Sequence, residues 1–161
     1  MSAPSIRAAT AADLPALQEI FRRASLSNDG DRDALLAHPD ALVLSGAAIA
    51  EGRTSVEVGA DGRVFGFITI LTLDESTLEI EDLFTDPDSM RKGVASRLVA
   101  HVVQAAVESG VRRVEVTGNL HAAGFYSYAG FIHDHDTQTE FRPAPRLCLT
   151  LSGSQSSESP G

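Results

Sequence analysis

The chain has 161 residues, 43% of them hydrophobic and 22% charged, which suits one globular domain with a buried core. Its 22 acidic residues outnumber its 13 basic ones, and the net charge of -9 argues against a nucleic-acid-binding protein, which needs a basic face. No apolar run reaches membrane-spanning length, and the first ten residues lack the pattern of a secretory signal. The single cysteine excludes an internal disulfide. We therefore expect a cytoplasmic protein that binds neither nucleic acid nor membrane.

The first third of the sequence predicts one strand followed by helices. Residues 6–9 are strand-like, and Thr10 with Asp13 is close to a capping box at a helix start. Apolar residues then recur every three or four positions, as on the buried face of a helix. Residues 31–37 predict a short second helix, and residues 41–52 are ambiguous, read as loop with some helix.

The middle of the sequence predicts three strands and the strongest helix in the chain. Residues 54–58 and 63–71 are strand-like and are separated by a glycine-containing turn, which predicts a hairpin. Residues 76–85 predict a third strand, ended by Pro87. Residues 93–109 then carry a continuous apolar stripe at helical spacing.

The last third predicts a strand at 113–117, a short helix at 122–129 and two strands around 137–141 and 146–151. The overall order is β-α-α-β-β-β-α-β-α-β-β, which predicts a mixed sheet packed between helices, an α/β or α+β fold. We expect one domain over residues 1–151. The Ser-rich tail, residues 152–161, lacks a hydrophobic pattern and is expected to be disordered.

The stretch FTDPDSMRKGVASRL, residues 84–98, joins a predicted strand to the long helix. It is not the phosphate loop of nucleoside triphosphatases, because Asp88 replaces a required glycine and no hydroxyl follows Lys92. Gly93 allows a ligand to approach the backbone closely, and the amides at the positive end of the helix suit a pyrophosphate. The alternative is an ordinary strand-to-helix turn with solvated basic residues.

A second motif, NLHAAGFYSYAGF at residues 119–131, follows one strand later. Together with MRKGVA at residues 90–95, it resembles the GNAT superfamily of acyl-CoA-dependent N-acyltransferases, whose motifs are [QR]-x-x-G-x-[GA] and N-x-x-A-x-x-F-Y-x-x-x-G-F. The resemblance extends from residue 6 to about 151 and includes 79–87 as the family's central strand. It implies a mostly antiparallel seven-stranded sheet with about four flanking helices, acetyl-CoA as cosubstrate and no metal.

The resemblance also implies the residues that bind the cosubstrate. Leu83 and Thr85 are expected to offer backbone groups to the pantetheine arm, and Asn119 to bind the cofactor or a bridging water, although it could instead cap the following helix. Met90 departs from the usual Gln or Arg, so one side-chain contact to the phosphates is expected to be missing. The full expected set is Leu83, Phe84, Thr85, Met90, Arg91, Lys92, Gly93, Val94, Ala95, Ser96, Asn119, His121, Ala122 and Phe125.

Amine acetylation calls for a base, because under about 0.1% of an alkyl amine with a pKa near 10 is neutral at pH 7. The candidates are Glu79, Glu81 and Asp82 on the predicted central strand. Strand alternation places Glu79 and Glu81 on one face and Asp82 on the other. The resemblance points to Glu79. The alternative is that these carboxylates face solvent or pair with Arg91, Arg113 or Arg142.

Tyr126 matches the position of the family's general acid, because a protonated tyrosine can donate to a leaving thiolate. A buried aromatic role is the alternative. The run His133-Asp134-His135-Asp136 contains metal-ligand types, but alternation puts both histidines on one strand face with no third partner, so solvated residues are favoured. Cys148 is interpreted as a packing residue.

The favoured function is an N-acetyltransferase in which a primary amine attacks acetyl-CoA directly within a ternary complex. A small amine or amino-acid-like acceptor is favoured as the partner. A non-catalytic acyl-CoA-binding module and a protein N-terminal or lysyl acetyltransferase are the alternatives. A homodimer is compatible with the scaffold, although no sequence feature decides the oligomeric state.

Overall fold

The computed structural model describes residues 4–26, 32–33, 36–38, 43–117, 123–138 and 143–151. The strands are β1 (Ser5–Ala8), β2 (Thr54–Val58), β3 (Val64–Asp74), β4 (Thr77–Thr85), β5 (Arg113–Thr117), β6 (Ile132–Gln138) and β7 (Pro143–Thr150). The helices are α1 (Leu14–Leu26), α3 (Ala47–Ala50), α4 (Val94–Glu108) and α5 (Ala123–Tyr128), with short 3-10 turns η1 (Ala11–Asp13) and η3 (Pro87–Ser89).

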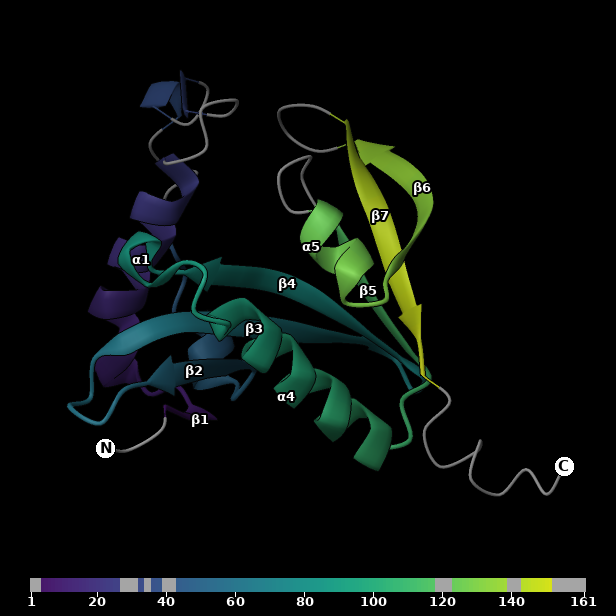
Figure 1. Cartoon of the computed structure of the whole chain (residues 1–161), viewed down its shortest axis with the longest axis horizontal. Coiled ribbons are helices and arrows are strands. Elements are labelled where there is room, and N and C mark those ends of the chain that lie inside the picture. The colour runs from purple at the N-terminus through teal and green to yellow at the C-terminus, as the bar shows by residue number, and fades with distance from the viewer. Residues whose placement is uncertain are drawn as a thin grey trace, which may run out of the picture. The chain divides into compact units, whose positions relative to one another are not determined.

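The seven strands form one sheet in the order β1-β2-β3-β4-β5-β7-β6 (Figure 1). Pairing is antiparallel between β1 and β2, β2 and β3, β5 and β7, and β6 and β7. It is parallel between β4 and β5. A parallel neighbour requires a crossover, and α4 supplies it between these two strands. The predicted fold class, a mixed seven-stranded sheet with flanking helices, is confirmed.

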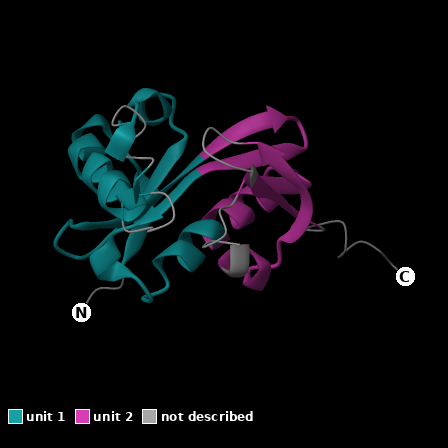
Figure 2. Cartoon of the chain, turned by 90° about the horizontal axis from the view of Figure 1, so that it is seen from above, with its two compact units in different colours: residues 1–69, 82–99 teal, residues 70–81, 100–161 magenta. Residues whose placement is uncertain are grey.

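The chain divides into two compact units, one with residues 1–69 and 82–99 and the other with residues 70–81 and 100–161 (Figure 2). The strands β3 and β4 and the helix α4 contribute residues to both. The single domain expected over residues 1–151 stays a prediction, and the expected tail lies outside the described residues. No helix in the described part of the chain is long and apolar enough to cross a membrane.

The core of the first unit forms between α1 and the neighbouring strands. Leu17 and Ile20, three positions apart on α1, are buried in one cluster with Val56 of β2 and Phe67 of β3. At the start of this segment the Thr10 N–H donates to the Asp13 carboxylate at 2.8 Å, which confirms the capping box. The aromatic packing extends to β4, where the Phe84 ring contacts those of Phe21 and Phe67.

In the second unit, strand alternation separates an apolar face from a polar one. Val114 and Val116 of β5 are buried, and they pair in register with Leu149 and Leu147 of β7. The intervening residues of β5 are polar: Arg113, Glu115 and Thr117. Because directly paired residues share a face, the polar face continues onto the neighbouring strands.

The strand β6 begins at Ile132, five residues before the start predicted at residue 137. Its pairs with β7 run from Ile132↔Cys148 to Gln138↔Pro143, so the partner strand extends β6 through a stretch whose polar composition resembles a turn. A bulge shifts the register between His133 and His135, which pair with the adjacent residues Leu147 and Arg146. The expectation that both histidines share a face is therefore wrong.

Candidate functional site

The loop after β4 has the backbone geometry of an anion-binding turn. Arg91 has φ 66° and Gly93 has φ 82°, so two of three consecutive residues are in the left-handed region. Such residues occur in backbone nests, where successive N–H groups converge on an anion. Arg91, Lys92 and Gly93 are all exposed. The loop therefore presents its backbone and two cationic side chains to solvent.

The helix α4 adds further donors. Its first backbone bond runs from the Arg97 N–H to the Gly93 carbonyl at 2.9 Å. The amides of Val94, Ala95 and Ser96 precede that bond and have no acceptor within the helix. They lie at the positive end of the helix dipole, which favours a phosphate. Loop and helix together fit the pyrophosphate of a nucleotide-like ligand.

The helix start is pressed closely onto the strands beneath it. A Cβ placed on Gly66 of β3 would lie 2.8 Å from the Phe84 carbonyl oxygen and 2.8 Å from Cγ1 of Val94. Only glycine permits this approach. The sequence pattern did not single out Gly66, because a glycine inside a strand indicates close packing without identifying the partner.

Asp86 holds the beginning of the loop. Its buried carboxylate accepts hydrogen bonds from the Asp88 N–H at 2.9 Å, from Arg23 of α1 at 3.1 Å and from Arg63 at 3.2 Å. Burial by itself raises the pKa of Asp86, but the Asp88 amide and the two arginines outweigh it and hold the pKa below its ordinary value. The sequence signal for this role is an Asp directly before a proline that opens a helical turn.

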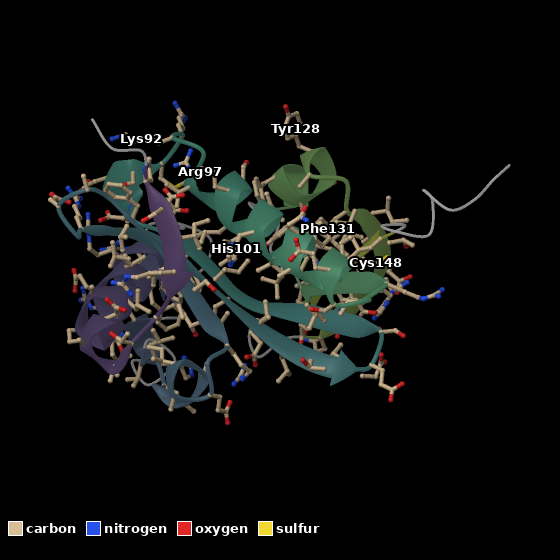
Figure 3. The ribbon with its side chains drawn as sticks, turned by 90° about the horizontal axis from the view of Figure 1, so that it is seen from below. Lys92, Arg97, His101, Tyr128, Phe131 and Cys148 are labelled. Carbon is tan, nitrogen blue, oxygen red and sulfur yellow. The ribbon has the colours of Figure 1, made fainter. Side chains whose placement is uncertain are left out.

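Arg97 fastens the other end of the loop. Its Nε and Nη2 donate to the two oxygens of the buried Glu57 at 2.7 and 2.8 Å, and its Nη1 donates to the Lys92 carbonyl at 2.9 Å. Figure 3 shows Arg97 close to Lys92 at the start of α4. The hydrogen bonds with Glu57 raise the pKa of Arg97. No sequence pattern predicted this pair, whose members are 40 residues apart.

The predicted base candidate Glu79 belongs to an ion-pair network on the polar face of the second unit. Its Oε2 accepts a hydrogen bond from Nη1 of Arg146, a partner that was not among the arginines expected from the sequence. Arg146 also donates to Thr117 Oγ1 and to Glu115 Oε1, each at 2.8 Å. The hydrogen bond from Arg146, with a further one from Arg113, holds the pKa of Glu115 below its ordinary value despite partial burial.

The other two carboxylates of β4 differ in their surroundings. Glu81 is exposed and Asp82 is half-buried. Alternation places Asp82 on the face of the buried Leu78 and Ile80, whereas Glu79 pairs in register with Glu115 of β5. The structure therefore brings Glu79, and not Asp82, onto the polar face.

Tyr126 is buried in an aromatic cluster of the second unit. Its ring makes edge contacts with Phe125 and Phe131 at centroid distances of 5.2 and 5.4 Å. Burial raises the pKa of the Tyr126 hydroxyl, which therefore stays protonated well above neutral pH. Both roles considered for this residue, proton donor and core aromatic, are compatible with this geometry. Tyr128, by contrast, is exposed.

The remaining candidates fall into three groups. Leu83, Phe84 and Thr85 are half-buried in the last part of β4, and the described pairs with β5 end before them, at Ile80↔Val116. Met90 is exposed and Phe125 is half-buried. Three further predicted residues lie outside the described part of the chain: Asn119, His121 and Ala122.

The side chains of the histidine-rich strand contact one another. His133 lies 2.9 Å from Asp136, and His135 lies 2.8 Å from Asp134, with all four side chains exposed. Within the described ranges, no three His, Cys, Asp or Glu side chains are grouped to hold a metal ion. Cys148 is buried, as a packing residue would be.

The sequence matches a family model described as the Acetyltransferase (GNAT) family over residues 14–131. Solved structures agree with this fold. Ard1 from Thermoplasma volcanium superimposes with a TM-score of 0.74 at 18% identity, over 93% of this chain and 99% of that one. The PaiA N-acetyltransferase from Thermoplasma acidophilum, in complex with coenzyme A, gives a TM-score of 0.72 at 15% identity, over 93% of this chain and 100% of that one.

A larger enzyme contains a similar domain. N-acetylglutamate synthase from Neisseria gonorrhoeae, complexed with coenzyme A and N-acetyl-glutamate, gives a TM-score of 0.69 at 21% identity. The match covers 94% of this chain but only 36% of the synthase chain. At such identities the likeness concerns the fold alone. No curated protein matches the sequence.

Proposed function

The chain belongs to the GNAT family of acetyltransferases, and we propose that it transfers the acetyl group of acetyl-CoA to a primary amine by direct attack within a ternary complex. The observation that carries this proposal is the loop at residues 90–96, where left-handed Arg91 and Gly93 lead into the open amides of α4. That geometry suits a pyrophosphate, and coenzyme A contains one. The cosubstrate supplies an activated thioester, so no covalent enzyme intermediate is required.

The loop residues from Met90 to Ser96 are proposed to hold the phosphates, chiefly through backbone N–H groups. Arg91 and Lys92 add positive charge at the exposed rim. Met90 cannot supply the hydrogen bond that a Gln or Arg would, and its exposed side chain fits a rim position where that loss weakens binding only modestly.

The last part of β4 is proposed to line the pantetheine arm. Leu83 and Thr85 would offer backbone groups, and the end of the described β5 pairing at Ile80 supports this proposal because neither residue belongs to a described pair with β5. Phe84 would contribute backbone only, since its ring packs against Phe21 and Phe67. From the second motif, Asn119, His121, Ala122 and Phe125 remain proposed cosubstrate contacts.

Glu79 is the proposed general base. Arg146 anchors one oxygen, Oε2, and the other has no hydrogen bond to any residue that the structure describes. A carboxylate that an arginine holds by one oxygen can accept a proton at the other from an amine or from a water molecule. Glu81, exposed on the same face, is the second candidate, and Asp82 on the opposite face is the third.

Tyr126 is the proposed general acid. Because burial raises the pKa of its hydroxyl, the group is a hydrogen-bond donor throughout the physiological range. A thiol is a stronger acid than a phenol, so the departing thiolate is stabilised by a hydrogen bond from the tyrosine more readily than by a full proton transfer. The rings of Phe125 and Phe131 hold Tyr126 in position.

A small cationic amine or amino-acid-like molecule is the proposed acceptor. The net charge of -9 and the three carboxylates of Glu79, Glu81 and Glu115, set against Arg113 and Arg146, favour an ammonium group over an anion or a nucleic acid. A peptide amine is the other acceptor class to test.

The test is acetyl-CoA turnover, followed as free thiol release, with panels of small amines, amino acids and peptides. Turnover with the small amines would support the proposal, and turnover with peptides alone would shift the acceptor class. Coenzyme A binding without turnover on any amine would favour a non-catalytic acyl-CoA module. If coenzyme A fails to bind in calorimetry, the proposed cosubstrate is wrong.

A further inference from the structure

An ion pair between β2 and α4 holds the backbone of the proposed cosubstrate loop. Glu57 has a side chain only 1% exposed, although it is a carboxylate on a strand of the core. Nε and Nη2 of Arg97, on α4, donate to the two carboxylate oxygens of Glu57, and Nη1 of Arg97 donates to the Lys92 carbonyl oxygen. A chain of three hydrogen bonds therefore runs from the sheet, through the helix, to the loop backbone.

The ion pair is held by its buried member, because Glu57 cannot be left without its partner. A buried carboxylate without a partner is strongly unfavourable, so Glu57 requires the guanidinium. The guanidinium is planar, and two of its nitrogens are committed to the fork. The direction of the third, Nη1, is then set, and with it the position of the Lys92 carbonyl oxygen that it binds.

Fixing this carbonyl also fixes an amide of the anion site. In a trans peptide the C=O and N–H bonds point in opposite directions, and this structure contains no cis peptide among the described residues. With the Lys92 oxygen turned toward Arg97, the N–H of Gly93 points away from it. Gly93 itself lies directly against Arg97, because a Cβ there would be 2.8 Å from Nη1.

We propose that Glu57 and Arg97 are positioning residues for the cosubstrate: they hold the Lys92–Gly93 peptide with its N–H turned toward the phosphates. They set the affinity for acetyl-CoA and take no part in acetyl transfer. This inference rests on the proposed function, since the loop must be the phosphate site. It predicts that weakening the pair raises KM for acetyl-CoA while kcat stays the same.

The variants are Glu57→Gln, which keeps the shape of the buried side chain without its charge, and Arg97→Lys, which cannot bind Glu57 as a fork and also reach Lys92. The control is Arg7→Lys. Arg7 forks onto Asp13 at 2.8 and 3.0 Å and is 44% exposed, against 42% for Arg97, but its partners do not include the loop. The double variant Glu57→Gln/Arg97→Gln retains a neutral hydrogen-bonded pair if either single variant unfolds.

KM for acetyl-CoA and Kd for coenzyme A are expected to rise about fivefold to tenfold in both single variants, the loss of about one hydrogen bond, with kcat within about twofold. Hydrogen exchange should quicken in peptides covering residues 90–96 without ligand. Arg7→Lys should change none of these. Unchanged KM, Kd and exchange in both variants would overturn the inference and leave the proposed function standing. Failure of the unmodified protein to bind coenzyme A would overturn the proposed function instead.

Discussion

Each compact unit contains an arginine–carboxylate network, and the two are built in opposite senses. In the first unit the carboxylate is the buried member: Glu57 is 1% exposed and Arg97 is 42% exposed. In the second unit the central arginine is the less exposed member: Arg146 is 14% exposed, and its partners Glu79 and Glu115 are 22% and 20% exposed. The less exposed member is the anchor in each, and the other member is the more accessible to solvent.

This difference matches the chemistry proposed for each unit. The first network presents N–H donors and fixes a loop backbone, which suits an anionic ligand. The second presents carboxylate oxygens held by a guanidinium, which suits an ammonium group or a proton transfer. Similar arginine–carboxylate pairs thus suit ligands of opposite charge. The less exposed member of each pair is fixed, and the more exposed member is accessible to a ligand.

The largest effect is expected for Glu79→Gln, which removes the proposed base from the second network. We expect kcat to fall about hundredfold or more, with KM for acetyl-CoA unchanged, because proton removal is lost and the phosphate loop is intact. Thiol release measured between pH 6 and 9 checks this. Glu115→Gln is the matched control, since it breaks the same network from its other side and should reduce kcat much less. A larger loss in Glu81→Gln than in Glu79→Gln would move the base to Glu81.

The next effect is expected for Gly93→Ala in the loop. Alanine costs about 1–2 kcal/mol in the left-handed region, and its Cβ would meet Arg97 at 2.8 Å, so Kd for coenzyme A should rise about tenfold to thirtyfold. Gly110→Ala is the control, because Gly110 has the same φ of 82° with no atom within 4 Å of an added Cβ. It should lower stability similarly and leave Kd unchanged. Equal Kd values in both variants would show that Gly93 has no special role in binding coenzyme A.

A smaller effect is expected for Tyr126→Phe in the second unit. The ring keeps its contacts with Phe125 and Phe131, so thermal stability should change little, while loss of the hydroxyl should lower kcat about tenfold. The control is Tyr128→Phe at an exposed site, which should have no effect. Because burial raises the pKa of Tyr126, the unmodified protein should show no loss of kcat from its ionisation up to pH 9. Unchanged kcat in Tyr126→Phe would show that Tyr126 is a core aromatic residue and not the general acid.

The smallest effect concerns the Arg7–Asp13 fork, which belongs to neither network and shows what such a pair contributes to stability alone. The hydrogen bond from Arg7 lowers the pKa of Asp13 to about 2, below its ordinary value of 3.8. The stabilisation is therefore complete above about pH 4 and is lost as the pH falls toward 2, and we expect about 1–2 kcal/mol because Arg7 is partly exposed. Urea unfolding from pH 2 to 6 should show this loss, and Asp13→Asn should remove this part of the pH dependence and leave the part that comes from Asp86 and Glu115.

Local patterns in the sequence predicted most of the fold. The alternation of Thr54–Val58 and the apolar stripe of Val94–Glu108 predicted a strand and a helix close to those observed, because period and capping act over a few residues. The phosphate-loop candidate was found in the same way, since Gly93 stands directly before its helix. These features depend on backbone conformations that neighbouring residues determine.

The tertiary structure alone decided which charges meet. Glu57 and Arg97 are 40 residues apart, and Glu79 and Arg146 are 67 apart, so their pairing depends on strand register and on the position of α4. Register also extended β6 back to Ile132, where the polar sequence by itself resembles a turn. A side chain's type limits what it can bind, but its burial and its partner are set by contacts distant in the sequence. The sequence therefore named the loop and the acidic strand, and the fold determined what holds each of them.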